Sequence, residues 1–94
     1  MINKTIAKIE ASIGKMGHVD PRKKKEISRL LATLKTEIEA LSKTHQDEAR
    51  RITSHLGTLS QKDLSASVQG FESSHPALVQ AINDFCYALA GIGI

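Results

Sequence analysis

The densest group of side chains that could bind a ligand is the basic part of the stretch PRKKKE, residues 21–26. The basic residues are Arg22, Lys23, Lys24 and Lys25. Four neighbouring cations could contact phosphate groups of a nucleic acid or of anionic lipids. Against this, no aromatic residue lies among them to stack on a base, and positive charge at a helix start is mildly unfavourable. We favour a solvated first turn of a helix, and phosphate binding is the first alternative function.

Histidine is the second residue type that could do chemistry, and the four histidines are spread along the chain. They are His18, His45, His55 and His75. None lies three or four residues from another, which is the usual spacing of two metal ligands on one helix face. The sequence therefore predicts no metal site and no cofactor. A small-molecule or metal site beside His75 is the second alternative function.

Motifs of catalysis are missing from the sequence. It contains no G-x-S-x-G, no phosphate loop and no Gly-rich dinucleotide fingerprint. The single cysteine, Cys86, has no partner of a reactive thiol in its sequence neighbourhood, so we expect it to be a small buried hydrophobe. A lone cysteine fits a reducing compartment. We find neither a signal peptide nor a run of roughly 18 apolar residues, and expect a non-enzymatic, cytoplasmic protein.

The elements that position these residues follow from composition and periodicity. With 94 residues, 40% of them hydrophobic and 24% charged, the chain has room for one globular domain, residues 1–94. Apolar residues in the first half step by four and three, which is typical of amphipathic helices. The two stripes are Ile2, Ile6, Ile9, Ile13 and Met16, and Ile27, Leu31, Leu34, Ile38 and Leu41.

Local signals mark where the helices start. Asp20 followed by Pro21 predicts a helix start, because the carboxylate can cap free backbone N–H groups and proline fits the first turn. No Gly or Pro occurs between Pro21 and Gly57, so one helix of about 36 residues is possible. The apolar pattern slips in phase near residue 45, and Thr44 with Asp47 resembles a capping box. We favour a break in the segment 42–48, and a single helix stays open.

The second half predicts a short helix capped by Ser60, a junction at His75-Pro76, and a final helix that is apolar almost all round. The apolar positions of that helix include Leu78, Val79, Ile82, Phe85, Cys86 and Leu89, and its polar ridge is Gln80, Asn83, Asp84 and Tyr87. We expect it to be the centre of a bundle. Gly91 is the predicted C-terminal cap, with Ile92 and Ile94 folding back over apolar surface.

Residues 65–94 contain Phe-Glu, then Ser-His-Pro, an apolar helix and a final Gly-Ile. The positions are Phe71, Glu72, Ser74, His75, Pro76, Leu78, Gly93 and Ile94. This stretch resembles the C-terminal signature of an uncharacterised bacterial family of short helical proteins, catalogued as a domain of unknown function. The resemblance implies a helical fold and a bacterial, cytoplasmic setting, and it brings no activity. We interpret residues 71–76 as a structural junction.

Together these patterns predict an all-α, single-domain bundle of four or five helices with short connections. The favoured function is a small interaction or scaffold protein that forms a homodimer, with a further protein partner possible; the sequence argues against nucleic-acid and membrane partners. Residues 1–43 carry ten basic and five acidic residues, whereas residues 44–94 carry three and five. The apolar stripes exceed what one chain of this size could cover, so we expect an antiparallel dimer held mainly by apolar contacts.

Overall fold

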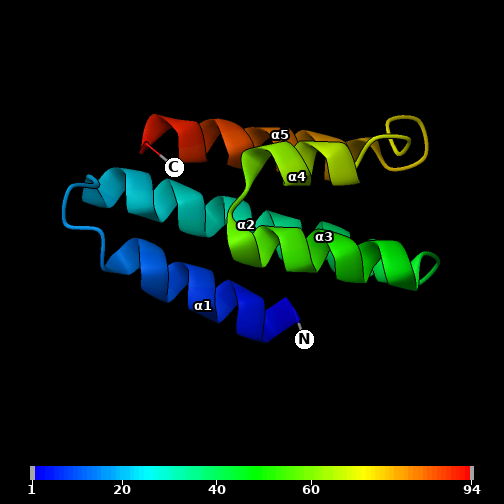
Figure 1. Ribbon diagram of the computed structural model, residues 1–94, viewed down its shortest axis with the longest axis horizontal. Helices are drawn as coiled ribbons and strands as arrows, with labels where there is room; N and C mark the ends of the chain where they lie inside the picture. Colours follow the sequence, from blue (N-terminus) through cyan, green and yellow to red (C-terminus); the bar gives the residue numbers. More distant parts are fainter. Residues whose placement is uncertain (1, 94) are drawn as a thin grey trace.

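The computed structural model describes residues 2–93, which form five α-helices and no β-strand. The helices are α1 (Ile2–Gly14), α2 (Pro21–Ser42), α3 (Gln46–Thr58), α4 (Gln61–Ser67) and α5 (Pro76–Gly91). Figure 1 shows them roughly aligned with the long axis, with α2 between α1 on one side and α5 on the other. The predicted all-α class and the small bundle of short-linked helices are confirmed.

Helix α2 starts as the sequence predicts. The carboxylate of Asp20 accepts a hydrogen bond of 2.8 Å from the backbone N–H of Arg22, and Pro21 occupies the first turn. All five residues of the predicted stripe, from Ile27 to Leu41, are buried. The helix is long because its only proline stands at the position where a missing N–H has no consequence.

The predicted break between α2 and α3 is confirmed, but the predicted capping box is wrong. The residue that precedes α3 is His45, and its side chain makes no capping hydrogen bond. The Thr44 hydroxyl lies 3.4 Å from the carbonyl oxygen of Leu41 and 2.8 Å from Nδ1 of His45. It therefore closes the end of α2, and its distance from Asp47 in the chain has no structural consequence.

The sequence predicts the start of α4 correctly but not the cap at the end of α5. The Ser60 hydroxyl caps α4 as predicted, since it accepts a hydrogen bond of 3.3 Å from the backbone N–H of Asp63. At the end of α5, however, Gly91 is still helical, and the residue with positive φ (+84°) is Gly93. A positive φ is the conformation that favours glycine in a helix cap. Ile92 folds back and is buried as expected, and Ile94 lies outside the described residues.

The core is one continuous cluster of aliphatic side chains around a single aromatic ring. Its largest fully buried members are Phe85, Ile9, Ile27, Leu31, Leu34, Leu41, Ile52, Leu56, Leu64, Leu78, Ile82 and Leu89. These residues come from all five helices, and Ile2, Ile6 and Met16 pack partly buried against them. The apolar stripe of α2 is therefore covered within one chain, and that of the first helix is covered in part.

The prediction that α5 is the centre of the bundle is wrong. Helix α2 packs against α1, α3 and α5, whereas α5 packs against α2 and α4. The ridge of α5 that contains Gln80, Asn83, Asp84 and Tyr87 is exposed to solvent, and so are Ala77 and Ala90. Seven residues of α5 are buried on its other side, and an alanine is small enough to be left exposed without a large cost. The helix therefore looks apolar all round although one face of it is exposed.

Candidate functional site

The four basic residues 22–25 do not form one patch, because successive helix positions point about 100° apart. The Arg22 side chain is exposed and lies 3.9 Å from the Asp20 carboxylate. Lys24 donates a hydrogen bond of 3.1 Å to the carbonyl oxygen of Gly14, which ties α2 to the end of α1. The amine of Lys23 lies beside Gly91 in the last turn of α5, a position where the helix dipole favours a positive charge.

Arg22 and Lys25 instead share a surface with a residue that the sequence analysis did not single out. Together with Glu26 and Arg29 they line an open hollow of about 610 Å³. Arg29 lies one turn beyond Lys25. The spacing of residues 22, 25 and 29 by three and four could therefore have predicted from the sequence that these three cations share one helix face. Three cations on one helix face are a possible phosphate contact, although Glu26 opposes an anion there.

The signature residues at 71–76 form the junction between α4 and α5. The carboxylate of Glu72 accepts a hydrogen bond of 2.8 Å from the backbone N–H of Gly70, whose φ is +97°. The backbone N–H of His75 donates to the carbonyl oxygen of Phe71 at 2.8 Å, and Pro76 then begins α5. Ser74 is exposed. These contacts agree with the interpretation of the signature as a structural junction.

This junction brings together two histidines that are 30 residues apart in the chain. The ring centroids of His45 and His75 are 5.7 Å apart, and the Phe71 ring lies 5.5 Å from His45 and 5.7 Å from His75. All three pairs meet edge to face, an arrangement that aromatic rings favour. We call His45, Phe71 and His75 the ring cluster. The sequence analysis missed His45, although a hydroxyl residue followed by histidine precedes both α3 and α5.

The other two histidines lie away from the ring cluster. His18 places Nε2 3.4 Å from the carbonyl oxygen of Ile92, where the first loop meets the end of α5. His55 is half-buried in α3, and its Nδ1 atom is buried without a hydrogen-bond partner. Among residues 2–93, no group of three or more His, Cys, Asp or Glu side chains is arranged to hold a metal ion.

Cys86 is a free, buried thiol on the face of α5 that packs toward α4. Its sulfur lies 3.8 Å from the carbonyl oxygen of Gln61. Burial raises the pKa of the thiol above its usual value of 9.0, and a hydrogen bond with Ser65 opposes part of that rise. Because the thiolate is the reactive form, the environment makes Cys86 a poor nucleophile at neutral pH.

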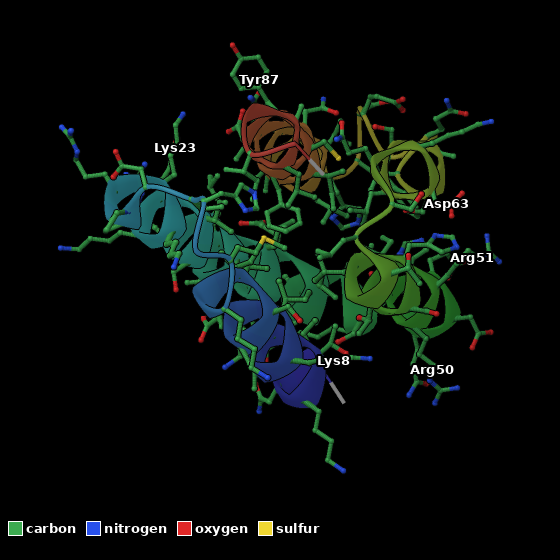
Figure 2. The ribbon with its side chains drawn as sticks, turned by 60° about the vertical axis from the view of Figure 1, so that its left-hand side comes forward. Lys8, Lys23, Arg50, Arg51, Asp63 and Tyr87 are labelled. Atoms are coloured by element: carbon green, nitrogen blue, oxygen red, sulfur yellow. The ribbon has the colours of Figure 1, made fainter. Side chains whose placement is uncertain are left out.

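The outer face of α5 is the least charged surface that any of the five helices presents. Asp84 is its only charged residue, and the amide of Gln80 donates a hydrogen bond of 2.9 Å to it. Tyr87 is 84% exposed and is the one large hydrophobic residue exposed among the described residues. Figure 2 shows its ring pointing away from the bundle. We call Ala77, Gln80, Asn83, Asp84, Tyr87 and Ala90 the α5 ridge.

Comparison with known proteins places this fold in a family. The family model described as "Domain of unknown function (DUF4404)" matches residues 2–94. The chain belongs to the DUF4404 family. The match extends the C-terminal resemblance to nearly the whole sequence, so all five helices belong to the family's domain. No curated protein matches the DUF4404 chain significantly, and no solved structure does so either.

None of the helices in the described part of the DUF4404 chain is both long enough and apolar enough to cross a membrane.

Proposed function

We propose that this DUF4404 protein is a non-enzymatic interaction protein that self-associates through the α5 ridge. The observation that carries the proposal is Tyr87, which is 84% exposed on a helix with one charged residue. Protein interfaces are enriched in tyrosine and depleted in charge at their centres. By contrast, every other helix exposes at least two charged residues, including the seven-residue α4.

The reason for expecting a partner differs from the one that the sequence offered. The α2 stripe is buried within the chain, and the first stripe is buried at Ile9 and Ile13 and partly buried elsewhere, so little of either stripe is left for a second copy to cover. The proposed contact surface is therefore the α5 ridge and not the stripes of α1 and α2. We further propose a bacterial, cytoplasmic protein, in keeping with its single reduced cysteine.

The α5 ridge is self-complementary in an antiparallel, two-fold pair. The midpoint of Pro76–Gly91 lies between Asn83 and Asp84. In a pair centred there, Asp84 of one copy faces the Asn83 amide of the other, and Gln80 faces Tyr87. Ala77 faces Ala90, so small side chains meet at both ends. A two-fold interface requires this reciprocity, and it keeps the two Asp84 carboxylates from facing each other directly.

Charge at the ends of α5 favours the same antiparallel orientation. Lys23 stands beside the last turn of the helix, whereas Glu72 lies just before its first turn. An antiparallel pair brings the end that carries Lys23 toward the end that carries Glu72. Figure 2 shows Lys23 projecting on the side of the molecule toward which Tyr87 points. Opposite charges across an interface fix its orientation more than they add affinity.

Sedimentation equilibrium tests self-association over about 10 µM to 1 mM, a range that covers weak complexes. We expect a monomer–dimer equilibrium that Tyr87→Lys weakens by about tenfold or more, because it places a charge at the interface. Ala11→Lys adds the same charge at an exposed position on α1 and should leave the equilibrium unchanged. The association should persist in about 0.5 M salt, where charges are screened beyond about 4 Å.

A disulfide experiment tests the register. In a Cys86→Ala background, Asp84→Cys lies next to the two-fold axis and should give an oxidised dimer, because disulfides need Cα atoms within about 7 Å. Ala77→Cys lies far from the axis and should stay reduced. A monomer at every concentration, together with no Asp84→Cys dimer, would show that the α5 ridge does not mediate self-association.

The exposed surface of α2 that carries Arg22, Lys25 and Arg29 supports a second candidate, the binding of nucleic acid or anionic lipid. Phosphate binding through these residues should weaken steeply with salt. Fluorescence anisotropy with a labelled duplex and co-sedimentation with phosphatidylserine vesicles measure the two ligands separately. Arg29→Ala should weaken binding, whereas Lys23→Ala, which removes a side chain directed to α5, should change it less.

A further inference from the structure

The ring cluster contains two imidazoles that lie side by side although neither of them caps a helix. His45 and His75 occupy the same position relative to α3 and α5, and their backbones have nearly the same conformation. The φ and ψ angles are −133° and 66° for His45 and −137° and 62° for His75. Neither side chain caps its helix. The two rings meet edge to face, with an angle of 86° between their planes.

The ring nitrogens are available for a ligand. Thr44 Oγ1 lies 2.8 Å from Nδ1 of His45 and forms a hydrogen bond with it. The other ring nitrogen, Nε2, is then the one that can bind a ligand. The ring nitrogens of His75 have no hydrogen-bond partner among the described residues, although the residue is half-buried. A hydrogen bond to one nitrogen of an imidazole sets the tautomer and directs the other nitrogen to a metal in many metal sites.

We propose that His45 and His75 form a two-imidazole site for a divalent transition-metal cation. Two imidazoles that share one cation through bonds of about 2.0–2.1 Å have ring centres roughly 5–6 Å apart. The observed separation of 5.7 Å falls in that range. Binding therefore requires rotation of the two rings, and the helices stay in place.

The surroundings of the pair both favour and limit the binding of a cation. Asp47 and Glu48 lie in the first turn of α3, and Glu72 precedes α5. Lys43 precedes α3 and Arg50 pairs with Asp47, so the acidic residues among these five outnumber the basic ones by one. The positive ends of two helix dipoles oppose a cation at the same place. Phe71 contacts both imidazoles edge to face and adds an apolar side chain to their surroundings.

The number of ligands determines which cation fits. No third His, Cys, Asp or Glu joins the two imidazoles among the described residues. Water completes the coordination, which leaves the site weaker than a structural zinc site with four protein ligands. With two nitrogen ligands and no thiolate, affinity should follow the general order for divalent metals, with Cu²⁺ bound most tightly and Ni²⁺ next.

Titration calorimetry with CuCl₂ and NiCl₂ on the full chain tests the site, and two histidines serve as matched controls. We expect one cation per chain, with affinity reduced by about tenfold or more in His45→Ala and in His75→Ala. His18→Ala and His55→Ala should leave the affinity unchanged. Circular dichroism of each variant shows whether it keeps the fold.

Proton NMR of the wild-type chain gives a second readout that needs no variant. Paramagnetic Ni²⁺ should broaden the ring resonances of His45 and His75 together, at lower cation concentrations than those of His18 and His55. Absence of binding up to about 1 mM, equal broadening of all four rings, or affinity unchanged in both ring-cluster variants would overturn the proposal. The site does not depend on the α5 ridge, so Tyr87→Lys should bind the cation like the wild type.

Discussion

Phe85 is the largest side chain in the core, and its ring is completely buried. Replacing it by alanine removes the one aromatic ring around which the aliphatic residues pack and leaves a cavity. We expect Phe85→Ala to lower the free energy of unfolding by about 3–5 kcal/mol. Urea denaturation followed by circular dichroism measures this loss, which is a large part of a small domain's stability.

Gln80→Ala provides the control on the same helix, because Gln80 is exposed and bonds only to Asp84. Its removal should change the free energy of unfolding by less than about 0.5 kcal/mol, as at other surface positions. Equal denaturation midpoints for wild type and Phe85→Ala would contradict the buried position of the ring.

The buried thiol of Cys86 should make the free energy of unfolding decrease at alkaline pH. Burial raises the pKa of the thiol in the folded chain above 9.0, whereas the unfolded chain has the ordinary value. The folded state therefore disfavours the thiolate, so this contribution to stability is present below the unfolded pKa and is lost as pH rises through the folded pKa. The free energy of unfolding should fall more between pH 8 and 10.5 in wild type than in Cys86→Ala, as measured by urea denaturation. Parallel pH profiles would show that the thiol titrates alike in both states.

Sequence reasoning at the residue scale succeeded where a contact is local. Asp20, Ser60 and Pro76 act within one turn of their own positions, so spacing alone predicted them. The pairing of His45 with His75 joins two loops 30 residues apart and depends on how α3 and α5 start side by side. No local pattern encodes such a contact. Likewise, the four cations at residues 22–25 are adjacent in the sequence, but the helix directs their side chains to different sides.

At the scale of single elements, the break between α2 and α3 gives a direct test. His45 precedes α3, and Gln46 is therefore its first residue, where a backbone N–H has no helical partner. Proline is tolerated at this position because its φ suits the first turn. We expect Gln46→Pro to change the free energy of unfolding by less than about 1 kcal/mol, measured by chemical denaturation.

Arg50→Pro is the matched control, since Arg50 is also exposed but lies inside α3. There a proline removes a helical hydrogen bond and should cost about 3 kcal/mol or more. A loss of that size in Gln46→Pro would mean that α2 and α3 are one continuous helix in solution.

The position of α5 shows what element-scale patterns leave open. Periodicity identified the packed faces of α1 and α2, because burial needs a stripe with the helical repeat. It did not identify the central helix, since a helix rich in alanine looks apolar all round even where its surface is exposed. Ala77 and Ala90 are exposed on α5, whereas α2, with nine charged residues, lies between α1 and α5.

At the scale of the whole molecule, the apolar core dominates and charge contributes little. The ion pairs found among residues 2–93, Arg22 with Asp20 and Arg50 with Asp47, each join neighbours in the sequence. Exposed pairs of this kind contribute about 0–1 kcal/mol. Neither of these two pairs joins the basic first half of the chain to the acidic second half.

The arrangement of the helices around α2 predicts an order of local opening. Amide groups exchange slowly where they open only with the whole core, and quickly at frayed ends and in short elements. Helices α2 and α3 each pack against three others, but α2 is the longer of the two, with 22 residues against 13. The central amides of α2, around the fully buried Leu31 and Leu34, should therefore exchange slowest. The seven-residue α4 and the first turn of α1, where Ile2 and Ile6 are only partly buried, should exchange fastest. Native-state hydrogen exchange with mass spectrometry measures this order. If α5 were instead the most protected helix, this would contradict the central position of α2 and would support α5 as the centre of the bundle.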